Sequence, residues 1–275
     1  MPLVDTVAQS IDYHFFIDQK ELFLLVKSIT TSTINMEATL HSNNKIARLA
    51  ASLFFFLCVP LSIWDGFYVP RKIFVPQDPV ATANNLLSYE FIFRTSIVSH
   101  LIGFLIFVFM IVLFYRIFRP VDKHLSQLML FSILAQIPVV FVFEVFNFTS
   151  LMILKSEARP TFDIAQQQEA AYFLLRMPRY AVGAGMGKLF IGLCFIPFGM
   201  LVFRSGLAPR IIGILLIIGG VGYVADCCIA VLLQRSDYVM VRSYLMSTTV
   251  CYALALLWFL VKGVRKPTPI DNHQM

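Results

Sequence analysis

The sequence predicts an all-α, polytopic transmembrane helical bundle, and three observations indicate this fold class. Six apolar stretches are each about twenty residues long, enough for a helix to cross the roughly 30 Å hydrocarbon core of a bilayer. They cover residues 46–66, 96–115, 127–147, 182–203, 210–233 and 244–263. Hydrophobic residues make up 58% of the 275-residue chain and charged residues 14%, whereas soluble domains carry about 25% charge. The basic residues stand singly near the ends of the stretches, which is typical of a membrane protein and gives no indication of nucleic-acid binding.

The chain divides by composition into three parts. Residues 1–45 form a polar and amphipathic segment, residues 46–264 a six-span transmembrane domain, and residues 265–275 a short tail. Two interpretations of the first segment remain open: an interfacial helix built on Tyr13–Lys27, or a native start at Met36 that leaves residues 1–35 outside the protein. We see no internal repeat and no pair of broken helices of the kind found in many secondary transporters.

The distribution of Lys and Arg predicts that both termini lie in the cytoplasm. With six spans, the termini share one side of the membrane with the two short loops at residues 116–124 and 204–209. These loops and their edges carry Arg116, Arg119, Lys123, Arg204 and Arg210. Because short cytoplasmic loops are enriched in basic residues, this side is assigned to the cytoplasm.

One long connection, residues 155–180, contains an amphipathic pattern that predicts a helix. Its N-cap is expected to be Thr161 or Asp163, since both residue types accept hydrogen bonds from the first turn. Two roles are open for this helix: a rim or lid lying on the outer membrane surface, or a simple connector.

Ionisable residues within the spans are the best indication of where function lies. A charged side chain at the centre of a membrane helix costs on the order of 3 kcal/mol, so each one needs a partner, a cavity or a route to the interface. The up-and-down threading brings these residues into the same half of the membrane: Asp65, Arg94, His100, Glu144, Lys188 and Asp226. Either they are structural, with Glu144 or Asp226 paired to Lys188, or they line a polar cavity that is open to the outside.

Other motifs predict packing instead of chemistry. Gly183–Lys188 resembles a phosphate-binding loop only superficially, because it has the wrong glycine spacing and no Ser or Thr after the lysine. A small-residue packing face is the better interpretation, continued by Gly219, Gly220 and Gly222. The five cysteines have no CxxC spacing, and the chain contains neither HExxH nor GxSxG. We therefore predict no catalytic residue, no cofactor and no metal site.

One block of sequence resembles a known family. The stretch Leu201–Gly213 (LVFRSGLAPRIIG), followed by Gly219–Asp226 (GGVGYVAD), resembles the bacterial membrane family described as domain of unknown function 4386. The similarity covers about residues 44–264 and is most specific at this block. It implies a helical bundle of about six spans in the bacterial inner (plasma) membrane, and it implies no activity.

The leading functional hypothesis is a small-molecule binding or transport-like protein with an outward-facing polar cavity. Its candidate ligand-binding residues are Glu144, Lys188 and Asp226, with His100 and Arg94 as accessory residues. The alternative is a non-catalytic membrane protein for sensing or partner binding, whose intramembrane charges are structural. An intramembrane enzyme is the third hypothesis. The expected partners are the lipid bilayer and a small molecule, and the sequence specifies neither the ligand nor the oligomeric state.

Overall fold

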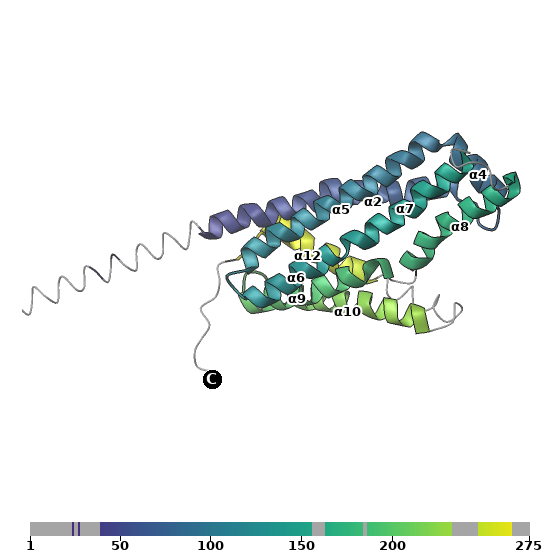
Figure 1. The fold of residues 1–275 in the computed structure, drawn as a ribbon. Helices are drawn as coiled ribbons and strands as arrows, with labels where there is room; N and C mark the ends of the chain where they lie inside the picture. The colour runs from purple at the N-terminus through teal and green to yellow at the C-terminus, as the bar shows by residue number, and fades with distance from the viewer. Residues whose placement is uncertain are drawn as a thin grey trace, which may run out of the picture. The chain divides into compact units, whose positions relative to one another are not determined.

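A computed structural model of the chain describes residues 24, 27, 39–155, 163–183, 186–232 and 247–265, and every regular element in these ranges is a helix (Figure 1). The chain divides into two compact units, Met1–Asn44 and Lys45–Met275. The second unit contains the helical bundle. The predicted all-α class is confirmed.

Four helical segments among the described residues are long and apolar enough to cross a bilayer: Thr39–Ile73, Glu90–Phe118, Lys123–Leu154 and Arg210–Ile229. Two shorter apolar helices, Leu189–Ser205 and Val250–Lys262, fall at the fourth and sixth predicted stretches. All six predicted apolar stretches are thus helical in their described parts, and four have the full length of a span. The prediction of cytoplasmic termini stays a prediction.

The first span is not a regular α-helix. It contains two π-helical turns, η1 (Phe54–Cys58) and η2 (Trp64–Tyr68), which alternate with the short helices α2 (Val59–Ile63) and α3 (Val69–Ile73). Each π-turn is followed at the same spacing by a proline, Pro60 and Pro70, within a repeated Val-Pro pair. Proline lacks an N–H and its ring displaces the carbonyl one turn earlier, so a widened turn before it relieves the clash.

Two helices follow on the far side of a short loop. Helix α4 (Pro79–Ser88) begins at Asp78, whose Oδ1 accepts a 2.8 Å hydrogen bond from the Ala81 N–H, and α5 (Glu90–Phe118) is an uninterrupted 29-residue span. The third span is broken at Gln136 into α6 (Lys123–Ala135) and α7 (Ile137–Leu154). Pro138 explains the break, because the second residue of α7 has no N–H to continue the ladder of α6.

Helix α8 (Ile164–Gly183) is the amphipathic helix that the sequence predicts. The Asp163 carboxylate accepts a 2.7 Å bond from the Gln166 N–H, and the Gln166 side chain accepts a 3.1 Å bond from the Asp163 N–H. This reciprocal capping box confirms Asp163 as the N-cap, while Thr161 lies outside the described residues. The helix packs along α7 and also contacts α4 (Figure 1).

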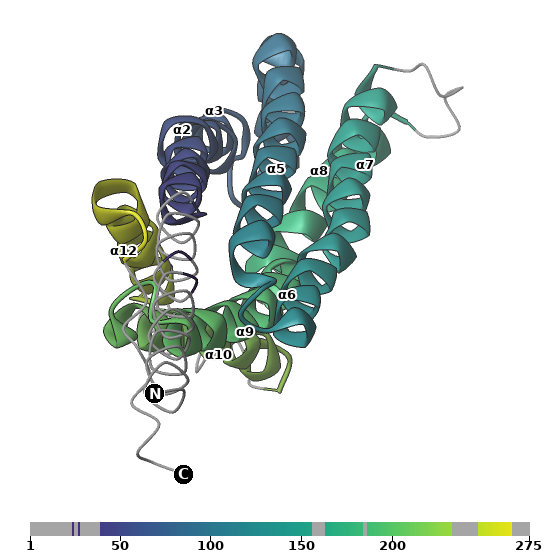
Figure 2. The same cartoon turned by 90° about the vertical axis from the view of Figure 1, so that its left-hand side faces the viewer.

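A seam of glycines joins α9 (Leu189–Ser205) to α10 (Arg210–Leu232), which lie side by side (Figure 2). A Cβ on Gly199 would lie 2.5 Å from the Gly213 carbonyl oxygen, and one on Gly192 would lie 2.7 Å from the Gly220 oxygen. Only glycine permits such backbone contact. Glycine packing of the predicted kind is therefore present between α9 and α10. This glycine seam (Gly192, Gly199, Gly213, Gly220) shares Gly220 with the predicted face, which comprises Gly183, Gly187, Gly219, Gly220 and Gly222.

The turn between α9 and α10 is held by local contacts. Gly206 adopts a left-handed conformation (φ 64°) that ends α9, and the Ser205 hydroxyl accepts a 3.2 Å bond from the Leu207 N–H. Arg204 makes a 2.8 Å ion pair with Asp122, the N-cap of α6. The last helix, α12 (Ser247–Lys262), returns to this turn, where the Arg265 N–H donates to the Leu207 oxygen.

Candidate functional site

An intramembrane ion pair joins α5 to α7. His100 Nδ1 bonds to Glu144 Oε1, and the Asn147 amide donates a 3.1 Å bond to Glu144 Oε2. The Glu144 side chain is 7% exposed and that of His100 is 35% exposed. Both carboxylate oxygens of Glu144 are therefore engaged, and the histidine is the more accessible member of the pair.

A second carboxylate lies beside this pair. Asp65, in the π-turn η2, is close enough to interact electrostatically with both His100 and Glu144. Its Oδ1 is buried and has no hydrogen-bond partner among the described residues. Buried polar atoms in proteins are nearly always satisfied, so an unpartnered carboxylate oxygen needs an explanation. We call Asp65, His100, Glu144 and Asn147 the polar cluster.

The helices position the polar cluster by ordinary packing and by one unusual turn. Glu144 and Asn147 are three residues apart on α7 and therefore share a face. The Trp64 indole donates a 3.3 Å bond to the Thr95 hydroxyl and ties η2 to α5. The widened backbone of η2 sets the direction in which Asp65 projects, and π-turns of this kind occur often at functional sites.

The chemistry of the polar cluster favours positive charge. With two carboxylates and one imidazole, its formal charge is −1 when the histidine is protonated and −2 when it is neutral. In the described part of the chain, no three His, Cys, Asp or Glu side chains are grouped so as to hold a metal ion. The arrangement therefore suits protons or a small organic cation that brings its own hydrogen-bond donors.

Two of the five predicted site residues, His100 and Glu144, are bonded directly to each other. Arg94 instead pairs with Glu90 one turn earlier on α5 at 2.7 Å, and Lys155 at the end of α7 joins the same carboxylate at 3.1 Å. This three-residue network occupies the start of α5 and uses the positive charge of Arg94 locally.

Lys188 and Asp226 come from the short turn before α9 and from α10. Lys188 ends the short 3₁₀ turn η3 (Met186–Lys188), and its Nζ lies 5.5 Å from the centre of the Tyr223 ring on α10. Asp226, one turn further along α10, is 8% exposed. The structure thus gives Glu144 a partner on α5, whereas the structural interpretation of the sequence paired Lys188 with either Glu144 or Asp226.

Two residues play a larger part in the structure than the sequence indicated. Asp65 was expected only as one of several charges in the same half of the membrane, and the π-turn that carries it has a signal in the repeated Val-Pro pairs. Gln136 is 1% exposed; its amide donates a 2.9 Å bond to the Gly187 oxygen, and its Oε1 has no partner among the described residues. It links the break in the third span to η3.

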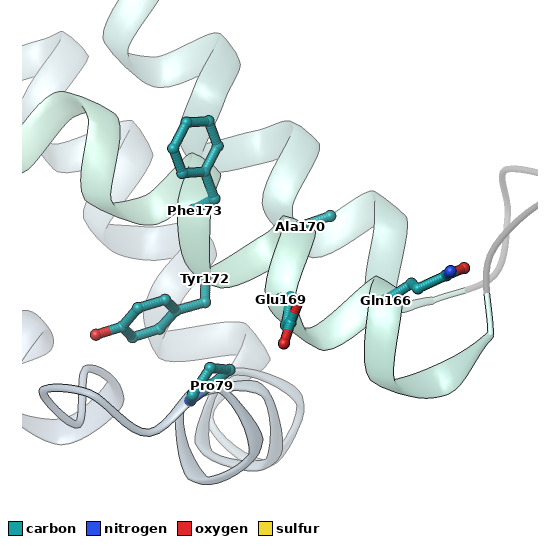
Figure 3. A pocket seen from close by; sticks show the side chains of 6 residues that line it. All are labelled: Pro79, Gln166, Glu169, Ala170, Tyr172 and Phe173. Carbon is teal, nitrogen blue, oxygen red and sulfur yellow. The ribbon is translucent and has the colours of Figure 1, made fainter.

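An open hollow lies elsewhere, between α8 and the start of α4 (Figure 3). Its volume is about 590 Å³, and its lining residues are Pro79, Gln166, Glu169, Ala170, Tyr172 and Phe173. The Tyr172 ring stacks on Phe74 at 5.2 Å, and its hydroxyl accepts a 2.8 Å bond from the Gln77 N–H. Tyr172 therefore braces the loop before α4, and the hollow shares no residue with the polar cluster.

The long apolar helices and their arrangement define a multi-pass α-helical membrane protein. Residues 50–263 match the family described as Domain of unknown function (DUF4386), so the chain belongs to this family, as the resemblance at Leu201–Asp226 predicts. Neither the curated proteins nor the solved structures contain a match.

Proposed function

We propose that this chain binds a small cation through the polar cluster, in a transport-like role. The observation that carries the proposal is the buried, unpartnered Oδ1 of Asp65 beside the His100–Glu144 pair. An unsatisfied carboxylate oxygen of this kind costs roughly 1–3 kcal/mol of stability, and binding sites often retain such groups at a cost. A bound alkylammonium ion supplies the missing donor and the compensating charge.

Access to the cluster is provided by His100. Its side chain is one-third exposed, while Glu144 lies behind it at 7% exposure. A ligand that approaches along this path meets the imidazole first and the carboxylates second. The proposal keeps the outward-facing polar site that the sequence suggests and centres it on His100, Glu144 and Asp65, without Arg94, Lys188 and Asp226.

The proposed setting is the bacterial inner membrane with both termini in the cytoplasm. The short basic loops at 116–124 and 204–209 support this orientation. The bacterial location rests on the family resemblance alone.

A matched set of small probes tests the proposal. Thermal unfolding of the full chain in mild detergent is measured with butylammonium chloride, sodium butyrate or butanol at equal ionic strength. Butylammonium is expected to raise the Tm of the wild type, and butyrate and butanol are not. The shift is expected to disappear in Asp65→Asn and Glu144→Gln and to persist in Glu90→Gln, a control that removes a paired carboxylate from the same helix as His100.

Two results would contradict cation binding. One is an equal response of the wild type to all three probes. The other is a butylammonium shift that survives in both Asp65→Asn and Glu144→Gln, since the cation would then act elsewhere on the protein or on the detergent.

The second candidate function is a non-catalytic sensing or partner-binding protein whose charges are structural. The observation that favours it is the complete pairing of Glu144, whose two oxygens bond to His100 and Asn147. This alternative expects no probe response and a loss of stability on removing either member of the pair.

A further inference from the structure

We infer that the end of the first span is a binding surface for an anionic phospholipid, with Arg71 and Lys72 holding the phosphate. This inference is independent of the proposed function of the polar cluster. It rests on two ladders of side chains at intervals of four residues, Ile63–Phe67–Arg71 and Trp64–Tyr68–Lys72, which run side by side across η2 and α3.

Direct contacts join Phe67 to Arg71 in the first ladder and Trp64, Tyr68 and Lys72 in the second. The Arg71 guanidinium lies 5.9 Å from the centre of the Phe67 ring, and the Lys72 ammonium lies 5.9 Å from that of Tyr68. Tyr68 in turn stacks on Trp64 at 4.9 Å. Each cation therefore lies over the aromatic ring four residues earlier in the chain, near the end of the span.

The ladder that ends at Arg71 presents an apolar strip on the surface of the protein. Ile63 is 54% exposed and Phe67 is 61% exposed. A Cβ on the adjacent Gly66 would meet no atom of the described residues within 4 Å, so the surface beside the strip is open in the part of the chain that the structure describes. A lipid acyl chain can lie along the strip, because the protein provides apolar contact there and no competing side chain.

The positive charge of Arg71 and Lys72 determines which class of lipid headgroup this surface favours. Arg71 and Lys72 are both exposed, and no described carboxylate forms an ion pair with either of them. The nearby Arg94 and Lys155, by contrast, are both bound by Glu90. Two adjacent uncompensated cations beside an apolar strip match a headgroup with net negative charge better than a zwitterionic one, whose ammonium would be repelled.

Native mass spectrometry of the full chain released from detergent tests the inference. Phosphatidylglycerol and phosphatidylcholine with identical acyl chains are added in equal amounts. The wild type is expected to bind phosphatidylglycerol more tightly, and R71Q/K72Q is expected to lose most of this preference. Each basic residue near a membrane surface contributes a factor of about five at low salt, so the double variant is expected to lose roughly 10- to 30-fold.

The matched control is R94Q/K155Q, which removes two positive charges that Glu90 already compensates, and it is expected to keep the preference. Should R71Q/K72Q not fold, R71Q and K72Q are measured singly, with a loss of about fivefold expected for each. The inference is overturned if the wild type binds both lipids equally, if R71Q/K72Q keeps the preference, or if the control loses it to the same extent.

Discussion

The glycine seam and the polar cluster differ in how closely the backbone packs and in what they contribute to stability. At the seam, the backbones of α9 and α10 are in direct contact. At the cluster, the first span widens into a π-turn and leaves a carboxylate oxygen unpartnered beside an ion pair. The close contacts of the seam stabilise the fold by dispersion, whereas the buried charges of the polar cluster reduce its stability.

This difference separates what holds the protein together from what it is able to do. The family block at Leu201–Asp226 encodes the turn and the α10 half of the seam, and its arginine at 204 pairs with Asp122. Most of that block therefore has a structural explanation. The polar cluster lies outside the block, on the first span, α5 and α7. The packing of these helices does not explain why Asp65 is present in the cluster.

The largest expected effect comes from breaking the seam. A Gly199→Val side chain would meet the Gly213 oxygen at 2.5 Å and the Ile217 N at 2.9 Å, and both are backbone atoms that cannot move aside cheaply. We expect a loss of about 3 kcal/mol in the free energy of unfolding, measured by denaturant titration in detergent micelles.

The control for this prediction is Gly103→Ala on α5. Its Cβ would lie 3.6 Å from Leu61 Cβ, an ordinary contact. We expect a change of no more than about 0.5 kcal/mol, since alanine also favours the helix slightly. Equal losses in the two variants would show that close backbone approach does not distinguish the seam.

An intermediate effect is expected within the polar cluster itself. In a double-mutant cycle of His100→Gln and Glu144→Gln, the two side chains should show a coupling free energy of about 1–2 kcal/mol, because they bond directly inside the bundle. The same cycle between Glu144 and Lys188 is expected to show much weaker coupling. A stronger Glu144–Lys188 coupling would restore the pairing that the sequence first suggested.

The smallest effect is expected at Asp122, at the edge of the bundle. The Leu125 N–H is the main influence that lowers the pKa of this carboxyl, and Arg204 adds to it. Because the pKa is lower in the folded state, the carboxylate stabilises the protein above the unfolded pKa of about 3.9 and ceases to do so as the pH falls through the lowered value.

Asp122→Asn keeps the helix cap and removes the charge. We expect its Tm to lie slightly below that of the wild type at pH 7 and the two values to converge as the pH falls through the lowered pKa of Asp122. A Tm difference that stays constant with pH would mean that the charge contributes nothing. High salt is expected to reduce the difference at pH 7, since the pair with Arg204 is exposed.

Much of the fold was predictable from the sequence, because membrane spans and helix caps leave local signals. The apolar stretches predicted the helices, and Asp163 predicted where α8 begins. Pro138 and the Val-Pro pairs also mark the break at Gln136 and the π-turns. The glycine packing was predicted in kind, but its register was not, since it depends on how two helices meet.

The candidate site was less predictable, since it depends on the contacts between spans. Depth along each helix grouped the six charges into one half of the membrane, yet depth does not fix which faces meet. His100 and Glu144 share an interface, and Lys188 lies against Tyr223. Rotation about each helix axis, set by packing along whole spans, decides among these partners.

The most direct test of the account compares the same substitution at two aspartates. Asp65→Leu is expected to raise the free energy of unfolding by about 1–3 kcal/mol, because it removes a buried oxygen that has no partner, and to abolish the response to butylammonium. Asp122→Leu is expected to lower the Tm, because Asp122 caps α6. If Asp65→Leu instead lowers the free energy of unfolding, Asp65 is a structural residue and the polar cluster is not kept for binding.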